Sequence, residues 1–334
     1  MPLLKAAPAD VVAEPVPVSL RATARRILGQ EAVALLLAWV VLCAVFTVWS
    51  PYFLNVQNAL NIGRSVAVTL VVASGTTIAL VGGLIDLSIA SVMNLTAVVI
   101  GTVSAAGLPM GVAIVVGIAC GTSVGLVNGL VITKLRINPI IVTLATAGIV
   151  QGIAYIVTSG EATPISSSTL NFLGTSNILG VPVSIVMALA VAVITFFVLR
   201  KTIFGRTVYM VGGNPVASSL AGINIDRWRV LFLLASSFSA SLAGLLLLAK
   251  VGSVIPDAAT GTELSIIAAV ILGGTSINGG SGTMQGTVVG VLILGTLTDG
   301  MTLLNINAYW QSIAAGVVLI LAVAADRLRT GGYR

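Results

Sequence analysis

The segment RKTIFGRTVYMVGGNPVASSLAGINIDRWR, from Arg200 to Arg229, is a polar island between two long apolar runs. It contains one acid, Asp226, and five cations: Arg200, Lys201, Arg206, Arg227 and Arg229. Because the cytoplasmic loops of membrane proteins are rich in Lys and Arg, this segment is predicted to lie on the cytoplasmic face. The orientation of the other segments is derived from this one. Asp226 is expected to be a lone, exposed acid in a basic loop.

A short helix is predicted in the middle of this island. Gly212-Gly213-Asn214-Pro215 forms a turn, and Pro215 favours the first turn of a helix over Val216 to Leu220 that ends at Gly222. This helix has too little apolar surface to fold alone. It either caps the bundle as an ordinary loop helix or docks closely into a groove of a partner protein through its small residues, which are Ala217, Ser218, Ser219 and Ala221.

The composition identifies the fold class. Of the 334 residues, 57% are hydrophobic and only 8% are charged, and the mean hydropathy is +1.12. Soluble domains carry about 25% charged residues, so we expect an all-α polytopic membrane protein. The chain is long enough for about ten crossings of ~20 residues each. Its net charge of +6 lies at the ends of spans, where orientation and lipid headgroups explain it better than nucleic acid does.

Several chemistries are excluded by the residues that the chain lacks. It contains no histidine, and its two cysteines, Cys43 and Cys120, lie in apolar runs without metal-ligand spacing. None of its lysines follows the glycine of a phosphate-binding loop, so the chain cannot hydrolyse ATP by that route. We therefore predict no catalytic residue, no metal site and no cofactor, and the chain is not expected to be an enzyme.

Ten apolar runs predict ten transmembrane helices with both termini in the cytoplasm. The runs are Ala32 to Trp49, Ile62 to Val81, Leu87 to Ala106, Met110 to Ile132, Ile140 to Val157, Val183 to Leu199, Val230 to Ala249, a short eighth run that ends at Leu272, Thr287 to Leu297 and Trp310 to Ala325. With the loops at 133–138, 200–229 and 276–284 inside, only Arg64 and Lys250 fall at outer ends. Residues 30–326 form the transmembrane domain, preceded by a disordered cytoplasmic tail at 1–29 and followed by a cytoplasmic tail at 327–334.

Two glycine-rich breaks interrupt these runs. Asp86 follows the break at Gly82-Gly83, and an isolated carboxylate at membrane depth must cap the next helix, face a polar cavity or pair with a cation. The break at Gly273-Gly274 indicates either a broken helix that lines a cavity or a close-packed turn. The candidate residues for a solute path are Asp86, Ser88, Asn94, Glu263, Gly273, Gly274 and Asn278.

The sequence GGNPVASSLAGINIDRWR, from Gly212 to Arg229, resembles the cytoplasmic coupling segment of permease subunits of ribose/xylose/galactose-type sugar ABC importers. The block from Thr260 to Gly295 resembles their glutamate-leucine, double-glycine block, and GLIDLSIAS from Gly83 to Ser91 resembles their Gly-Gly-Ile-Asp-Leu-Ser element. The resemblance covers roughly residues 60–325 and departs at Leu84, where the family usually has glycine. The ATPase-coupling residues that it implies are Gly213, Asn214, Pro215, Ala217, Ser218, Gly222 and Ile223.

This resemblance implies a multi-pass permease of the bacterial cell inner (plasma) membrane. Two copies of the chain are expected to form the path, with two ABC ATPase subunits on the coupling helices. A periplasmic or secreted binding protein would deliver a monosaccharide or related polyol. The alternative is a stand-alone ion-coupled secondary transporter of a small polar solute, in which Asp86 and Asp299 are candidates to bind the ion. A docking helix with no role inside the membrane favours the importer.

Overall fold

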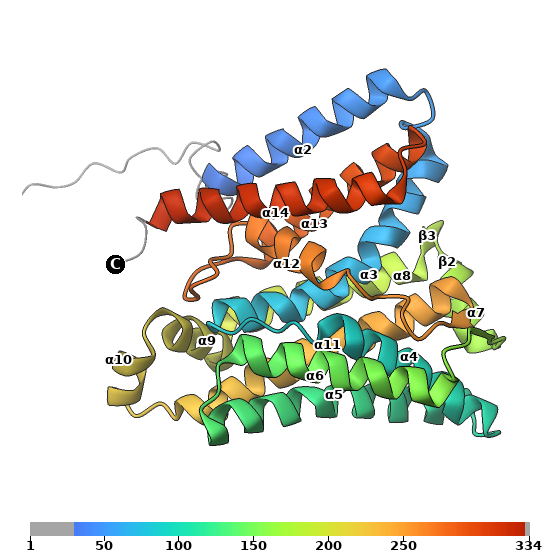
Figure 1. Cartoon of the computed structure of the whole chain (residues 1–334). Helices are drawn as coiled ribbons and strands as arrows, with labels where there is room; N and C mark the ends of the chain where they lie inside the picture. Colours follow the sequence, from blue (N-terminus) through green and yellow to red (C-terminus); the bar gives the residue numbers. More distant parts are fainter. Residues whose placement is uncertain (1–29, 331–334) are drawn as a thin grey trace, which may run out of the picture.

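The computed structural model describes residues 30–330 as a helical bundle (Figure 1), so the predicted tail at 1–29 and the end of the tail at 331–334 lie outside the described residues. The helices are α2 (Gln30–Trp49), α3 (Val56–Val81), α4 (Ile89–Ala105), α5 (Met110–Leu135), α6 (Pro139–Thr158), α7 (Ser168–Thr175), α8 (Val183–Lys201), α9 (Ile203–Gly213), α10 (Pro215–Leu220), α11 (Ile225–Val251), α12 (Glu263–Leu272), α13 (Met284–Leu303) and α14 (Ala308–Thr330).

Six helices of the described region, α3, α5, α6, α8, α11 and α13, are long and apolar enough to cross a membrane. Four shorter apolar helices lie at Val33–Trp49, Ile89–Ala105, Glu263–Leu272 and Ala308–Ala324. All ten predicted apolar runs therefore coincide with helices. Length and composition alone identify six of these helices as spans.

The helix α3 lies at the centre of the bundle, where every residue from Leu70 to Val81 is buried. It contacts α11 and α8 on one side and α12 and α13 on the other, so it joins two groups of helices that Figure 1 shows as separate layers. The glycines of α5 form a packing face. Cβ atoms at its glycines 121 and 125 would overlap Ser241 and Ser237 of α11, so these glycines allow the two helices to approach closely.

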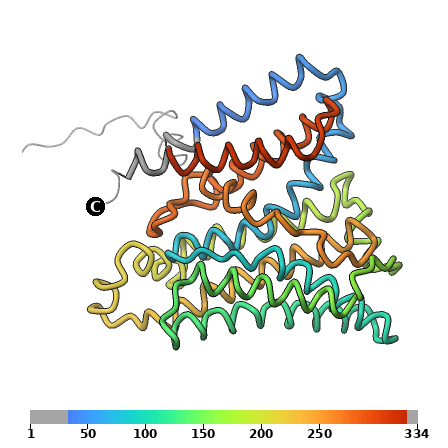
Figure 2. The backbone as a smooth tube through the Cα atoms, viewed as in Figure 1, coloured from blue at the N-terminus to red at the C-terminus, as the bar shows by residue number. Residues whose placement is uncertain are grey.

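Short elements occupy the two ends of the bundle (Figures 1 and 2). One end carries α7 and two strand pairs, β1 (Thr163–Pro164) with β4 (Ser253–Val254) and β2 (Asn177–Ile178) with β3 (Val181–Pro182). The other end carries α9 and α10, together with the first turn of α2 and the last turn of α14. The sequence predicted neither α7 nor α9, because both lie within polar segments that we interpreted as loops.

Candidate functional site

The helix α10 begins at Pro215, one residue before the predicted start at Val216, and ends at Leu220 as predicted. Asn214 has extended backbone and separates α9 from α10, and its side-chain oxygen accepts a hydrogen bond of 2.9 Å from the backbone N–H of Ala217. Pro215 occupies the first helical turn, where the missing N–H costs no hydrogen bond. After Leu220 the chain turns at Gly222, whose φ of 85° suits glycine, and the N–H of Ile223 bonds to the carbonyl of Ser218 at 3.0 Å.

One side of α10 is free of contacts with the rest of the chain. Val216 and Leu220, four residues apart on the same helix face, are 70% and 86% exposed, and Ala217 is also exposed. Ser218 is buried, and half-buried Ile223 packs against the cluster around Phe232. A six-residue helix with an anchored inner side and an exposed apolar outer side is suited to bind another protein.

Three glycine-containing turns meet directly before α10. The C-terminal end of α9 contacts the turn that follows α3 and the turn between α12 and α13. The N–H of Gly280 donates to the carbonyl of Val81 at 2.8 Å, and the hydroxyl of Tyr209 donates to the carbonyl of Gly282 at 2.8 Å. Burial raises the pKa of the Tyr209 phenol, which therefore stays a neutral donor at physiological pH. We call this contact of residues 81–83, 209–213 and 279–282 the glycine junction.

Backbone touches backbone in the glycine junction, which leaves no room for a side chain at Gly212 or Gly279. A Cβ atom at Gly212 would overlap the carbonyl oxygen of Val81 and the amide nitrogen of Gly280. A Cβ at Gly279 would lie 2.8 Å from the Cα of Gly83 and 2.9 Å from the carbonyl oxygen of Gly212. The end of α9 is therefore held rigidly against both turns, with only Asn214 between it and α10.

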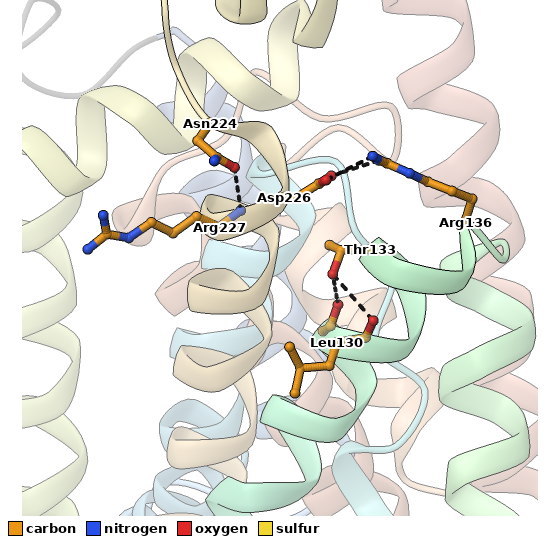
Figure 3. A network of polar contacts seen from close by, with 7 residues as sticks. Leu130, Thr133, Arg136, Asn224, Asp226 and Arg227 are labelled. Carbon is orange, nitrogen blue, oxygen red and sulfur yellow. Dashed lines mark hydrogen bonds and ion pairs between the residues drawn. The ribbon is translucent and has the colours of Figure 1, made fainter.

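Asp226 is not the lone exposed acid that the sequence predicts. Both of its carboxylate oxygens accept hydrogen bonds from Arg136, at 2.8 and 2.9 Å (Figure 3). Arg136 lies 90 residues earlier, in the turn between α5 and α6, so no local pattern indicates the pair. The side chains are 69% and 39% exposed, so the pair positions the turn after α5 and the start of α11 more than it stabilises them.

Asp86 is buried in an irregular segment, residues 84–88, that joins α3 to α4. Its carboxylate accepts three hydrogen bonds: from the N–H of Ser88 at 3.0 Å, the hydroxyl of Ser88 at 2.6 Å and the hydroxyl of Ser236 at 2.7 Å. Asn128 in turn donates to the Ser88 hydroxyl at 3.0 Å. Asp86 therefore accepts hydrogen bonds from Ser88 at the start of α4 and links this helix to α11 through Ser236. Within the described residues it pairs with no cation.

A second irregular segment, residues 252–262, precedes the short helix α12. Asn94 of α4 holds this segment, because its side-chain oxygen accepts from the N–H of Ala259 at 2.9 Å and its amide donates to Thr260 at 3.2 Å. Gln151 of α6 accepts from Asn94 at 2.9 Å and donates to the carbonyl of Pro256 at 2.8 Å. Polar side chains therefore supply hydrogen bonds to backbone groups of this irregular segment. Irregular backbone at membrane depth requires such partners, because no water is available there.

The remaining candidate path residues lie at three separate places. Glu263 is half-buried at the first position of α12, and Gly273 at the end of α12 packs against the backbone of Gly286. Gly274 has a φ of 87°, and exposed Asn278 lies in the turn beside the glycine junction. The structure therefore brings Asp86 and Ser88 together, but it places Asn94, Glu263 and Asn278 apart from them.

Sequence reasoning missed Gly212, Tyr209 and Gly280 of the glycine junction and the partners Arg136 and Asn128. The glycine pairs were visible as turns, but only the fold shows that they contact one another. In the described part of the chain, no three Cys, Asp or Glu side chains gather into a possible metal site.

Comparisons with known proteins agree with this architecture. Residues 58–323 match the family model described as branched-chain amino acid transport system / permease component. The ribose import permease protein RbsC of Haemophilus influenzae is 36% identical over 294 residues, which cover 87% of this chain and 91% of the relative. The L-arabinose transport system permease protein AraH of Escherichia coli (strain K12) is 37% identical over 294 residues, 88% of this chain and 89% of the relative. No solved structure matches the chain.

Proposed function

Because this chain belongs to the permease-component family that also includes the ribose and arabinose import permeases, we propose that it is the membrane subunit of an ATP-binding-cassette importer for a monosaccharide or related polyol. It is a multi-pass membrane protein and a transport subunit, since its relatives are permeases and not enzymes. Nothing in the comparisons favours the ion-coupled alternative.

The observation that best supports the proposal is the exposed face of α10. A helix of six residues outside the candidate spans, with Val216 and Leu220 exposed, has no evident role except to bind a protein. The chain has no phosphate-binding loop, so ATP hydrolysis must come from a partner. We place the ATPase subunit on this face, with Gly213, Asn214, Pro215, Ala217, Ser218, Gly222 and Ile223 as the coupling residues.

The proposed topology has ten crossings, with both termini and α10 on the cytoplasmic side of the bacterial inner membrane. It is supported by the position of α9, α10, the start of α2 and the end of α14 at one end of the bundle (Figure 1). In this topology α4 and α12 are crossings completed by irregular segments. Two copies of the chain would form the path, and a secreted binding protein would deliver the sugar to the opposite end.

The glycine junction gives this machine a direct mechanical link. A movement of α10 is transmitted through Asn214 to the end of α9, which contacts the turns at 81–83 and 279–282. These turns continue into the segment that holds Asp86 and into the connection between α12 and α13. Because packed backbones shift between discrete arrangements rather than deforming smoothly, displacement of α10 is expected to shift both elements together.

The candidate path residues Asp86, Ser88, Asn94, Glu263, Gly273, Gly274 and Asn278 divide into two roles in this proposal. Asn94 and Glu263 are placed at the irregular segment before α12, where buried Asn94 holds the backbone and half-buried Glu263 offers a polar group to a passing sugar. The other five residues support the breaks before α4 and after α12, which are expected to move: Asp86, Ser88, Gly273, Gly274 and Asn278.

Reconstitution of the chain with its ATPase subunit and binding protein in liposomes tests the function. ATP-dependent sugar uptake is expected only when all three components are present. Ala217→Arg should remove ATPase binding and uptake together, because it places a bulky cation on the docking face. Ala162→Arg, an exposed alanine at the opposite end of the bundle, serves as the matched control and should leave ATPase binding unchanged. Sugar accumulation by the chain alone, driven by a proton or sodium gradient, would contradict the proposal.

A further inference from the structure

A cavity of about 590 Å³ lies between α10 and the first turn of α11, beside the turn that follows α5. Val216 and Leu220 of α10 form an apolar wall of this cavity. Arg136, Asp226 and Arg229 supply its charged groups. We call this cavity the α10 pocket. Its volume falls within the range of roughly 300–1,000 Å³ that is typical of ligand sites, so it is large enough for the tip of a partner loop.

The charges of the α10 pocket do not balance. Asp226 already accepts two hydrogen bonds from Arg136 (Figure 3). Arg229 is half-buried, and within residues 30–330 it has no hydrogen bond or ion pair. Its Nε is shielded from solvent without an acceptor. The rest of this guanidinium is open to the pocket and has no anion within residues 30–330, so its positive charge is free to pair with an anionic group of a partner.

We propose that the α10 pocket receives an acidic side chain of the ATPase subunit, which pairs with Arg229 when that subunit docks on α10. This inference rests on the proposed function and deepens it by naming the chemistry of the contact. A protein that covers Val216 and Leu220 also covers the mouth of the pocket, since the same side chains form its wall. A carboxylate fits a guanidinium with two parallel hydrogen bonds, which adds geometric specificity to the apolar contact.

The competing occupant is the phosphate of an anionic lipid headgroup, because basic clusters near membranes also attract lipids. The protein partner is favoured by the apolar wall. Val216 and Leu220 are 70% and 86% exposed, on a helix that projects beyond the ends of the candidate spans (Figure 1). A lipid headgroup in the pocket would leave these two side chains uncovered.

The test measures the dissociation constant between the chain, in nanodiscs, and its ATPase subunit. Arg229→Gln is expected to weaken binding by about tenfold or more, because a buried charge contact loses its cation. Arg229→Lys keeps the charge but loses the two parallel hydrogen bonds, so its affinity should lie between those of wild type and Arg229→Gln. The matched control is Arg227→Gln: Arg227 is exposed, lies outside the pocket and points away from the Asp226–Arg136 pair (Figure 3). Its affinity should stay within about twofold of wild type.

A second pair of variants tests the pocket without removing Arg229. Ser219 is exposed on α10 and lies in the wall of the pocket, so its substitution leaves the fold intact. Ser219→Glu supplies a carboxylate in cis that competes with the partner, and it is expected to weaken ATPase binding about tenfold. Ser219→Gln has the same shape without the charge, so it is the reference for this variant: Ser219→Glu should bind the ATPase about tenfold more weakly than Ser219→Gln.

The outcomes separate this inference from the proposed function. If the wild-type chain does not bind the ATPase at all, the proposed function fails. If the wild type binds and Arg229→Gln and Ser219→Glu bind equally well, the function stands and the acidic contact is refuted. Loss of bound anionic lipid from Arg229→Gln, with unchanged ATPase affinity, would also refute it and assign the pocket to a headgroup.

Discussion

Replacing Gly212 by alanine is expected to uncouple this protein without unfolding it. The new Cβ would overlap the carbonyl oxygen of Val81 and the amide nitrogen of Gly280. Both are backbone atoms, so no change of rotamer relieves the overlap, and the turns must move apart. Overpacking of this kind costs ~1–3 kcal/mol. If the strain falls on one of two conformations of the transporter, it changes their equilibrium by about 5- to 150-fold.

The neighbouring glycine provides the control for this prediction. A Cβ at Gly213 would meet its nearest atom, the Cα of Gly280, at 3.7 Å, which is an ordinary contact. Both glycines lie in the last turn of α9, and alanine gains the same helix propensity at each, up to ~1 kcal/mol. The difference between Gly212→Ala and Gly213→Ala therefore reports the overlap alone.

The assay compares sugar uptake with ATPase binding in reconstituted liposomes. Because α10 itself is unchanged, Gly212→Ala should bind the ATPase subunit normally. Its sugar uptake should nevertheless fall at least about fivefold. Gly213→Ala keeps a small residue at this proposed coupling position and creates no overlap, so it should transport clearly more sugar than Gly212→Ala. The role of the glycine junction would be refuted if Gly212→Ala transported normally, or if Gly213→Ala were equally impaired.

Three further predictions concern topology, burial and charge. A cytosolic reporter fused after Asn214 should be active and one fused after Ser167 inactive; activity at Ser167 would overturn the ten-span topology. Asp86→Ala leaves three buried donors without an acceptor, so it should lower the free energy of unfolding by at least ~2 kcal/mol relative to wild type. Its melting temperature in detergent should be lower than that of Asp86→Asn, and equal melting temperatures would contradict this. A double-mutant cycle of Arg136→Gln and Asp226→Asn should give a coupling free energy of ~0.2–1 kcal/mol that decreases with salt, and a value above ~2 kcal/mol would show a much less solvated pair.

The elements that the sequence predicts well are those whose signals are local. Asn214 and Pro215 start α10 and Gly222 ends it, and the structure contains this helix with one additional residue at its start. Gly82 and Gly273 likewise stand directly after the last residues of α3 and α12. Caps, proline and glycine act through backbone within a few residues, so these boundaries are readable without the fold.

The contacts that the sequence does not predict join residues far apart in the chain. For Asp86 the sequence left three alternatives, and the choice depends on Ser236, which is 150 residues away. The Arg136–Asp226 pair spans 90 residues, and Gly212 contacts both Val81 and Gly280. The amphipathic face of α9 was overlooked for the same reason, since a buried face has meaning only when the surface that covers it is known.

The two irregular segments belong to one closed chain of contacts, through which the short helix α10 is proposed to act on both. From the glycine junction, residues 84–88 lead into α4, and Asn94 lies five residues, about 8 Å, along that helix. Asn94 holds the N–H of Ala259, and from there the chain enters α12, which ends at Gly273. The turn after α12 then returns to the junction at Gly280. Neither segment is therefore expected to move alone, because displacement of one strains the hydrogen bonds of the other. A movement of α10 that reaches this ring through α9 is expected to bias the breaks before α4 and after α12 in the same step.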